Sequence, residues 1–208
     1  MDKSNIILAL VGFSSAGKDT LAKYAHENLG YNFVVSHSTR PMRVGESQGN
    51  PYYFINDNEM CSLFVQNKLI EAREYDSVYG KWFYAISKDE IKDSKKYAVV
   101  VDFSGFLALK NHFGDRVKSV FIDCSEPERR KRAELRGDFN LDEWNRRYED
   151  DKAKFPKKLI SKHMDWILKT TKYSKEKSEN DLKVISFLAE NIGCSGEKKW
   201  LNQIIYTV

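Results

Sequence analysis

The sequence has few cysteines and places none of them in a metal-binding pattern. Its 208 residues include only Cys61, Cys124 and Cys194, and no two of these form a C-x-x-C pair. Three cysteines cannot all pair within one chain, so the sequence suggests neither a disulfide framework nor a zinc site. This usage favours a reducing environment, and we expect a cytoplasmic protein.

Long hydrophobic segments and an excess of one charge are also missing. The apolar run from Ile6 to Val11 ends at a glycine, is too short to span a membrane and lacks a small-residue cleavage site. The 34 basic and 30 acidic residues leave a net charge of +4, which is too mild to indicate nucleic acid as a partner. With 41% hydrophobic residues the chain can bury one substantial core. We therefore expect a single soluble domain with no membrane or nucleic-acid partner.

Apolar runs alternate with segments of helical spacing along the chain. Residues 6–11, 31–36, 97–103 and 117–123 read as strands, and residues 17–29, 104–114 and 181–191 read as helices. This alternation predicts an α/β fold with a parallel central sheet flanked by helices. Two short strands between residues 68 and 86 predict a small appended subdomain. The tail KKWLNQIIYTV, residues 198–208, could be an extra strand or a docking segment.

The stretch VGFSSAGKDT, from Val11 to Thr20, follows the phosphate-binding pattern G-x-x-x-x-G-K-[ST]. A glycine-rich turn between a buried strand and a helix aims backbone N–H groups and the positive end of the helix dipole at one anion. Lys18 would reach the β and γ phosphates of a nucleotide. The alternative is an ordinary strand-to-helix turn that happens to contain glycines. The expected ATP-binding residues in this loop are Gly12, Ser14, Ser15, Ala16, Gly17, Lys18, Asp19 and Thr20.

Asp19 stands where the pattern normally has a hydroxyl that touches magnesium. A carboxylate is a hard oxygen ligand, and Thr20 offers a hydroxyl one position later. We expect Asp19 or Thr20 to meet Mg²⁺. Alternatively, Asp19 only places a favourable negative charge in the first helical turn.

The stretch SHSTRPMRVGESQGNPYYF, from Ser36 to Phe54, offers guanidinium forks and phenol hydroxyls suited to a phosphate monoester. It resembles the GMP-binding signature of guanylate kinases, S-x-T-T-R-x-P-R-x-G-E-x-x-G-x-x-Y-x-F. The matching residues are Ser36, Thr39, Arg40, Arg43, Gly45, Glu46, Gly49, Tyr52 and Phe54. Ser38 replaces a threonine of the signature, and the proline precedes Met42 instead of following it.

The resemblance continues in LIEAREYDSVYG, which supplies Glu71, Tyr79 and Gly80. It implies that Glu71 accepts hydrogen bonds from guanine and that Ser36 meets the base. It also implies that Arg40, Arg43, Tyr52 and Tyr79 bind the monophosphate. Outside this context Glu71 would read as a salt-bridged strand carboxylate.

Two departures from the family pattern concern base and metal recognition. Lys81 stands where the family has serine or threonine; it could turn to solvent, favour another base or bind a second anion. YAVVVDFSG keeps Asp102 and Gly105 of the family's ILDIDxxG region but has Val100 for the first aspartate. Asp102 could contact the base or a substrate-bound water, or it could cap the following helix.

The charged segment CSEPERRKRAELRGDFNLDEWNRRYEDD matches the family's mobile lid through Arg132, Arg136, Gly137 and Arg147. Arginines four residues apart on one helix face can fold over a triphosphate, whereas a charged helix is otherwise a solvated surface. The lid reading places Arg132 and Arg136 on ATP, and it leaves Arg130 and Arg146 facing solvent.

The resemblance, which spans roughly residues 5 to 190, implies a P-loop NTPase fold and phosphoryl transfer from ATP to GMP, and to dGMP, with Mg²⁺ as cofactor. It divides the single domain of residues 1–208 into a core (1–35, 94–124, 149–208), a mixed-sheet GMP-binding subdomain (36–93) and a helical lid (125–148). Catalysis would come from positioning and charge neutralisation by Lys18, Arg40, Arg43, Arg136 and Arg147.

Other functions stay open at this point. A kinase of the same fold could use a deoxynucleoside monophosphate or a ribose bisphosphate as acceptor. A non-catalytic guanylate-kinase-like interaction module typically loses the phosphate loop, and a P-loop protein that uses ATP for motion on nucleic acid lacks the acceptor signature. Both a monomer and a homodimer are compatible with the sequence.

Overall fold

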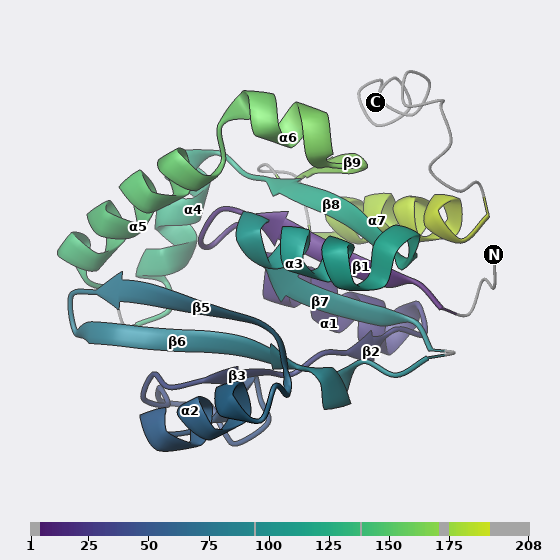
Figure 1. Cartoon of the computed structure of the whole chain (residues 1–208). Helices are drawn as coiled ribbons and strands as arrows, with labels where there is room; N and C mark the ends of the chain where they lie inside the picture. Colours follow the sequence, from purple (N-terminus) through teal and green to yellow (C-terminus); the bar gives the residue numbers. More distant parts are fainter. Residues whose placement is uncertain (1–4, 94, 138, 171–174, 192–208) are drawn as a thin grey trace.

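The computed structural model describes residues 5–93, 95–137, 139–170 and 175–191 (Figure 1). Its strands are β1 (Ile7–Gly12), β2 (Asn32–Phe33), β3 (Ser36–Ser38), β4 (Tyr52–Phe54), β5 (Leu69–Ser77), β6 (Gly80–Ser87), β7 (Tyr97–Val101), β8 (Val117–Asp123) and β9 (Trp166–Lys169). Its α-helices are α1 (Lys18–Asn28), α2 (Asp57–Val65), α3 (Phe103–Phe113), α4 (Glu126–Glu134), α5 (Leu141–Lys154), α6 (Lys157–His163) and α7 (Lys175–Asn191). The predicted α/β fold is confirmed.

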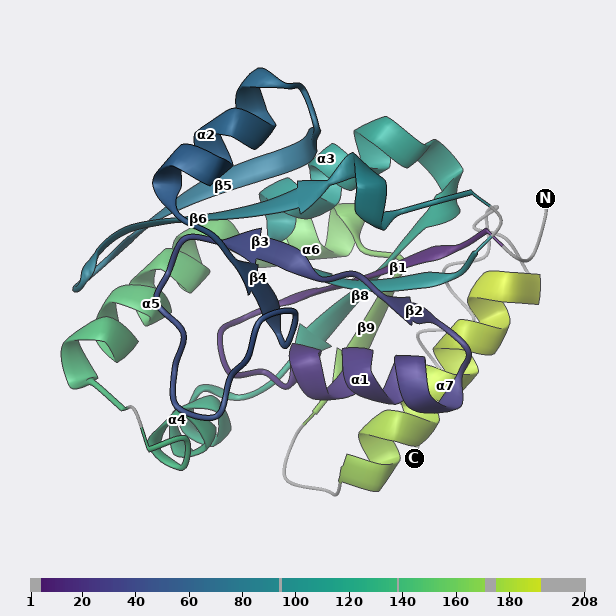
Figure 2. The same cartoon turned by 90° about the horizontal axis from the view of Figure 1, so that it is seen from below.

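The central sheet is parallel, with the strand order β2-β7-β1-β8-β9. All six residues of β1 are buried, as expected of a strand covered on both faces. Helices α1 and α7 lie side by side on one face, and α3 and α6 lie on the other (Figures 1 and 2). Parallel strands end at the same edge, so β1 and β7 bring the glycine-rich loop and Asp102 to one side of the sheet.

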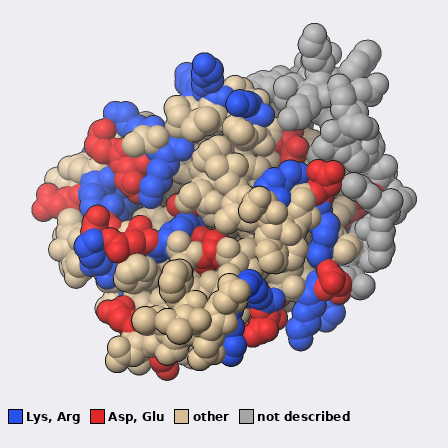
Figure 3. Space-filling model, in the orientation of Figure 1, with Lys and Arg blue, Asp and Glu red and all other residues tan. Residues whose placement is uncertain are grey.

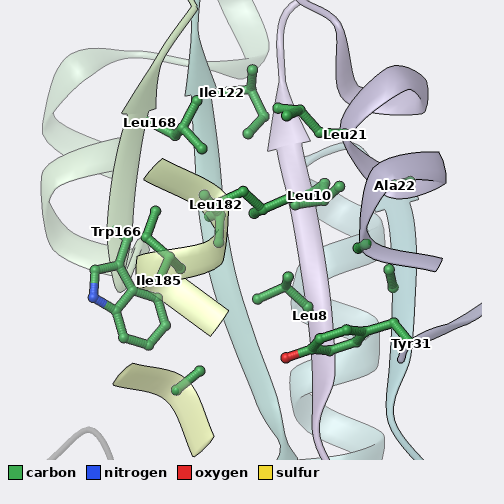
Figure 4. Packing of buried hydrophobic residues seen from close by; sticks show 14 of the residues in the cluster. Leu8, Leu10, Leu21, Ala22, Tyr31, Ile122, Trp166, Leu168, Leu182 and Ile185 are labelled. Carbon is green, nitrogen blue, oxygen red and sulfur yellow. The ribbon is translucent and has the colours of Figure 1, made fainter. Parts of the chain in front are cut away.

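Alternate residues of β1 build two cores. Leu8 and Leu10 pack toward α1 and α7, where they meet Leu21 and Leu182 (Figure 4). Ile7, Ala9 and Val11 belong to the other core, beneath α3 and α6. Because a strand sends successive side chains to opposite faces, one unbroken apolar run supplies both.

The second sheet is mixed and has the order β4-β3-β6-β5. Strand β3 pairs in parallel with β4 and antiparallel with β6, and β5 and β6 form the expected hairpin. The prediction of one strand over residues 31–36 was wrong. Residues 32–33 pair with β7 in the central sheet and Ser36 already pairs with β4, so the run is split between two sheets.

The charged segment after β8 forms two helices separated by a turn at Gly137, whose φ of +78° favours glycine. Helix α5 continues to Lys154, so it runs past the expected end of the lid at residue 148. The division into core, subdomain and lid stays a prediction. Helix α6 and strand β9 were not predicted, and the last helix begins six residues earlier than predicted. The tail from Gly193 lies outside the described residues.

Over the described ranges, no helix combines the length and the apolar character needed to cross a membrane.

Candidate active site

Three adjoining cavities open between the central sheet, the second sheet and helices α4 and α5. The loop cavity, of about 720 Å³, is lined by Ser14 to Asp19 together with Arg40, Arg43, Arg136 and Arg147. The strand cavity, of about 170 Å³, lies against the ends of β1 and β7 and the inner face of the hairpin. The lid cavity, of about 370 Å³, lies between the Arg40–Arg43 loop and α5. Ser14 and Arg147 line all three, so the cavities form one continuous cleft.

The glycine-rich loop leaves β1 at Gly12 and enters α1 at Lys18. A Cβ on Gly12 would lie 2.6 Å from the carbonyl oxygen of Ile122, so the turn needs a residue without a side chain. Lys18 Nζ donates to the carbonyl oxygens of Gly12 and Phe13, both at 2.8 Å. Burial lowers the pKa of this amine. The ammonium thus lies within the loop, where the sequence placed it.

Asp151 holds the loop from the side of α5. Its Oδ2 accepts a hydrogen bond from the backbone N–H of Ser14 at 2.7 Å and lies 3.4 Å from Nη1 of Arg129. Burial raises the pKa of this carboxyl against the lowering effect of those donors. The sequence analysis missed Asp151 because a lone acid in a charged helix carries no signal of burial.

Two of the expected lid arginines approach the loop. Arg132 donates to the carbonyl oxygens of Ala16, at 3.0 Å, and Thr170, at 2.9 Å, and its guanidinium lies over Gly17. Arg136 is exposed and lines the loop cavity. The structure therefore brings both residues toward the glycine-rich loop, and their contact with ATP stays a prediction. The expectation that they share one helix face was wrong, because α4 ends at Glu134 and Arg136 lies in the turn that follows.

Glu143 orders the remaining lid arginines. It accepts hydrogen bonds from Arg147 at 2.6 Å, from Arg146 at 2.9 and 3.0 Å, and from the backbone N–H of Val78 at 3.2 Å. Burial alone would raise the pKa of Glu143, but these donors lower it to about 2. Arg146 lines the strand cavity, so the expectation that it faces solvent was wrong. Interleaved blue and red side chains mark this edge in Figure 3, where α5 meets the tip of the hairpin.

Arg40 and Arg43 lie across the loop cavity from the glycine-rich loop. Arg40 is only 4% exposed and forms a two-pronged ion pair with Glu46, at 2.7 and 2.6 Å. Its guanidinium lies 5.1 Å from the ring centres of both Tyr52 and Phe54. The same carboxylate accepts the backbone N–H of Arg43 at 2.8 Å. Glu46 thereby fixes the loop that carries both arginines.

The expected magnesium ligands differ in their position. Asp19 is exposed and lines the loop cavity, whereas Thr20 is exposed and lines none of the three cavities. Nowhere in the described residues do three or more His, Cys, Asp or Glu side chains gather as a metal site would require. One carboxylate fits Mg²⁺, because this ion is commonly held by one or two carboxylates together with substrate phosphates and water.

The strand cavity contains several of the expected GMP-binding residues. Its walls include Ser36, Tyr52, Tyr84, Trp82, Arg73 and Asp102. Asp102 caps α3 by accepting the backbone N–H of Gly105 at 2.9 Å, and it also binds Arg73 at 2.9 Å. Burial would raise the pKa of Asp102, but the Arg73 guanidinium and these hydrogen bonds hold it far below its ordinary value. Asp102 is therefore both a cap and a cavity residue.

Glu71, Tyr79 and Lys81 lie outside the strand cavity. Glu71 is 8% exposed and forms an ion pair with Arg73. Tyr79 is 64% exposed at the tip of the hairpin, stacks on Trp82 and lines the lid cavity. Lys81 is exposed and pairs with Glu74, as in the first of the alternatives, in which it turns to solvent.

Comparisons with known proteins identify relatives of the chain. A family model described as guanylate kinase matches residues 4–178. A guanylate kinase of Francisella tularensis is 35% identical over 142 residues, which cover 64% of this chain and 73% of the relative. A guanylate kinase of Sulfurimonas denitrificans is 34% identical over 152 residues, which cover 71% and 72%.

Two further proteins match with lower sequence identity. A chloroplastic and mitochondrial guanylate kinase of Oryza sativa is 32% identical over 128 residues; the match covers 59% of this chain and less than half, 44%, of that longer relative. The crystal structure of guanylate kinase from Anaplasma phagocytophilum superposes with a TM-score of 0.65 and 22% identity, covering 92% of this chain and 89% of that one. At this identity the structural likeness shows the fold alone.

Proposed function

Because this chain belongs to the guanylate kinase family, we propose that it transfers the γ-phosphoryl group of ATP to GMP, and to dGMP, giving ADP and GDP or dGDP. The observation that carries the proposal is the loop cavity, which is lined by Lys18 on one side and by Arg40 and Arg43 on the other. A phosphate donor and a phosphate acceptor would meet there.

The glycine-rich loop binds the donor in this proposal. Its backbone N–H groups and the N-terminus of α1 hold the phosphates, and Lys18 exchanges its two carbonyl partners for the β and γ phosphates. The intact loop argues against a non-catalytic interaction module. The donor site comprises Gly12 and Ser14 to Thr20, with Arg132 and Arg136 above it.

Arg40, Arg43 and Tyr52 orient the acceptor phosphate. Glu46 and the flanking rings hold the Arg40 guanidinium in one position, which keeps its fork aligned with phosphate oxygens. The acceptor oxygen is already anionic, so the transfer needs no general base. Tyr79, at the hairpin tip, joins this site when the hairpin and the lid approach each other.

Charge neutralisation comes from Lys18, Arg136 and Arg147, which line the same cavity. Closure of α4 and α5 over the nucleotides excludes water from the reacting phosphates. Asp19, or Thr20 in the alternative assignment, would hold Mg²⁺, which supplies further neutralisation of the phosphate oxygens when it is bound.

The strand cavity takes the nucleoside of the acceptor, with Ser36 and Asp102 on its walls and Glu71 behind Arg73. Small nucleotides are the partners in this proposal, and the reaction takes place in the cytoplasm without membrane or nucleic acid. The proposal holds for a monomer and for a homodimer.

A coupled assay of ADP release tests the proposal with GMP, dGMP, AMP, CMP, UMP and dTMP as acceptors. Ribose 1,5-bisphosphate is included because the ribose-bisphosphate kinase is the rival of the same fold. We expect turnover with GMP and dGMP. Turnover with none of the nucleoside monophosphates would refute the proposal, and turnover with the ribose bisphosphate alone would establish the rival.

Lys18→Ala is the matching variant and should lower kcat at least ~100-fold. Lys23→Ala is its control, because Lys23 is 73% exposed on the same helix and pairs only with Glu27 among the described residues. Near-normal turnover of Lys18→Ala would remove the glycine-rich loop from the mechanism.

A further inference from the structure

Arg73 stands between the expected base-reading carboxylate and the strand cavity. Its Nε lies 2.6 Å from Oε2 of Glu71, and its Nη2 donates to Oε1 at 2.9 Å. Arg73 lines the cavity, whereas Glu71 does not. Both carboxylate oxygens of Glu71 therefore lie within ion-pair distance of the guanidinium, and Oε1 accepts a hydrogen bond from it; Oε2 and Nε have no hydrogen-bond partner among the described residues.

The other carboxylate beside the cavity is engaged as well. Oδ1 of Asp102 forms an ion pair with Nη1 of Arg73 and accepts hydrogen bonds from the hydroxyl of Ser104 and the backbone N–H of Gly105, each at 2.9 Å. Its Oδ2 accepts the hydroxyl proton of Tyr75 at 2.5 Å. Both carboxylates are thus ion-paired with Arg73, and Glu71 does not line the cavity that a base would enter.

The guanidinium itself keeps donors for a ligand. An arginine carries five N–H donors. One N–H of Arg73, on Nη2, donates a hydrogen bond to Glu71, while Nε and Nη1 form ion pairs with Glu71 and Asp102. One N–H on each terminal nitrogen has no acceptor within the part of the chain that the structure describes. The group also lies close against Gly105, where an added Cβ would be only 3.2 Å from Nη1.

We propose that Arg73 is the specificity-determining residue for the acceptor base and that it donates to O6 and N7 of a 6-oxopurine. This inference rests on the proposed function and names the base class of that same site. A guanidinium fork matches the two adjacent acceptors O6 and N7. Adenine places an amino group at the first of these positions, so two donors would face each other and both would be left unpaired.

Recognition through O6 and N7 leaves the 2-amino group of guanine without a role in base selection. A free carboxylate that binds N1–H and the 2-amino group would reject a base lacking that amine, because a buried polar group would lose its partner. Arg73 makes no use of either group. The site therefore accepts IMP as well as GMP, and it depends on N7.

The test compares kcat/KM of the full chain for GMP, IMP, AMP and 7-deaza-GMP, in which a C–H replaces N7. We expect IMP within about threefold of GMP, 7-deaza-GMP at least ~10-fold lower and AMP at least ~100-fold lower. A preference for GMP over IMP above ~100-fold, or equal use of GMP and 7-deaza-GMP, would overturn the assignment while leaving the proposed function intact. Absence of turnover with all four would instead count against the proposed function.

A variant tests the residue itself. Arg73→Lys keeps the positive charge beside Glu71 and Asp102 but loses the fork, so the penalty for 7-deaza-GMP should fall to within about threefold. Lys81→Ala, on the exposed face of the same hairpin, should keep the wild-type acceptor profile. An unchanged 7-deaza penalty in folded Arg73→Lys would assign the reading of N7 to another residue. If that variant does not fold, the wild-type comparison alone decides.

Discussion

The carboxylate of Asp151 lies 2.7 Å from the backbone nitrogen of Ser14, which stands 137 residues earlier in the chain. The same carboxylate lies 3.4 Å from Nη1 of Arg129, whose guanidinium rests over the ring of Phe13. One buried acid thus joins α5 and α4 to the glycine-rich loop.

Replacing Asp151 should destabilise the protein. Asp151→Ala leaves the buried guanidinium of Arg129 without its carboxylate partner, and we expect the free energy of unfolding to fall by about 3 kcal/mol. Urea denaturation at pH 7 measures the loss. The neighbouring Asp150→Ala is the control, since Asp150 pairs with Lys154 at one-third exposure and should change stability by less than ~0.5 kcal/mol. Equal losses in both variants would contradict the role given to Asp151.

Arg136 should affect turnover without affecting stability. It is exposed and lines the loop cavity, so Arg136→Ala removes charge near the reacting phosphates and should lower kcat by ~100-fold. Steady-state kinetics and a thermal melt separate the two effects. Arg130→Ala, in the preceding helix α4, loses only an exposed pair with Glu134 and should keep kcat within about twofold. A similar kcat in the two variants would rule out the closure of α4 over the nucleotide.

Glu143 should make stability dependent on pH in the acid range. Its pKa is about 2 in the folded protein, against an ordinary value of 4.5, because hydrogen bonds from Arg146 and Arg147 outweigh the effect of burial. A lowered folded pKa stabilises the fold above the unfolded pKa, and this contribution is lost as the pH falls from about 4.5 toward 2. Glu143→Gln lacks the contribution at every pH.

We expect the free energy of unfolding of the wild type to exceed that of Glu143→Gln by about 1 to 2 kcal/mol at pH 7. The shift in pKa alone would give a larger difference, but solvent screens the partly exposed arginine partners. The difference should shrink steadily between pH 5 and pH 3. Denaturant unfolding of both proteins at pH 7, 5, 4 and 3 measures it. A difference that stays constant with pH would show that Glu143 stabilises the fold by packing and not as a carboxylate.

Gly12 should tolerate no side chain. Its φ is +153°, and a Cβ would lie 2.6 Å from the carbonyl oxygen of Ile122 in the paired strand β8. Gly12→Ala should therefore cost at least ~3 kcal/mol, since strand backbone must move. Gly45→Ala is the control, with φ of +86° but open space around the added methyl, and should cost about 1 kcal/mol. Comparable melting temperatures for the two variants would show that β8 can move away from the added methyl group without loss of stability.

Much of the fold could be predicted from local pattern. The unbroken apolar runs of β1, β7 and β8 predict strands that are covered on both faces. The glycine pattern from Gly12 to Lys18 predicts a phosphate-binding turn. The split of residues 31–36 between two sheets could not be predicted this way. Strand propensity is the same on both sides of the break, and only the pairing partners differ.

Local sequence alone determined the donor loop and the arginine-rich acceptor loop, because each is a contiguous motif whose backbone turn and side chains act together. Tertiary structure decided the surroundings of Glu71. Its partner Arg73 is two residues away on the same face of β5, yet the pair lines up with Asp102 only because the hairpin packs over the end of β7. Charge pairing across separate elements depends on where those elements pack. No pattern within one segment determines the distance between charged side chains on two different elements.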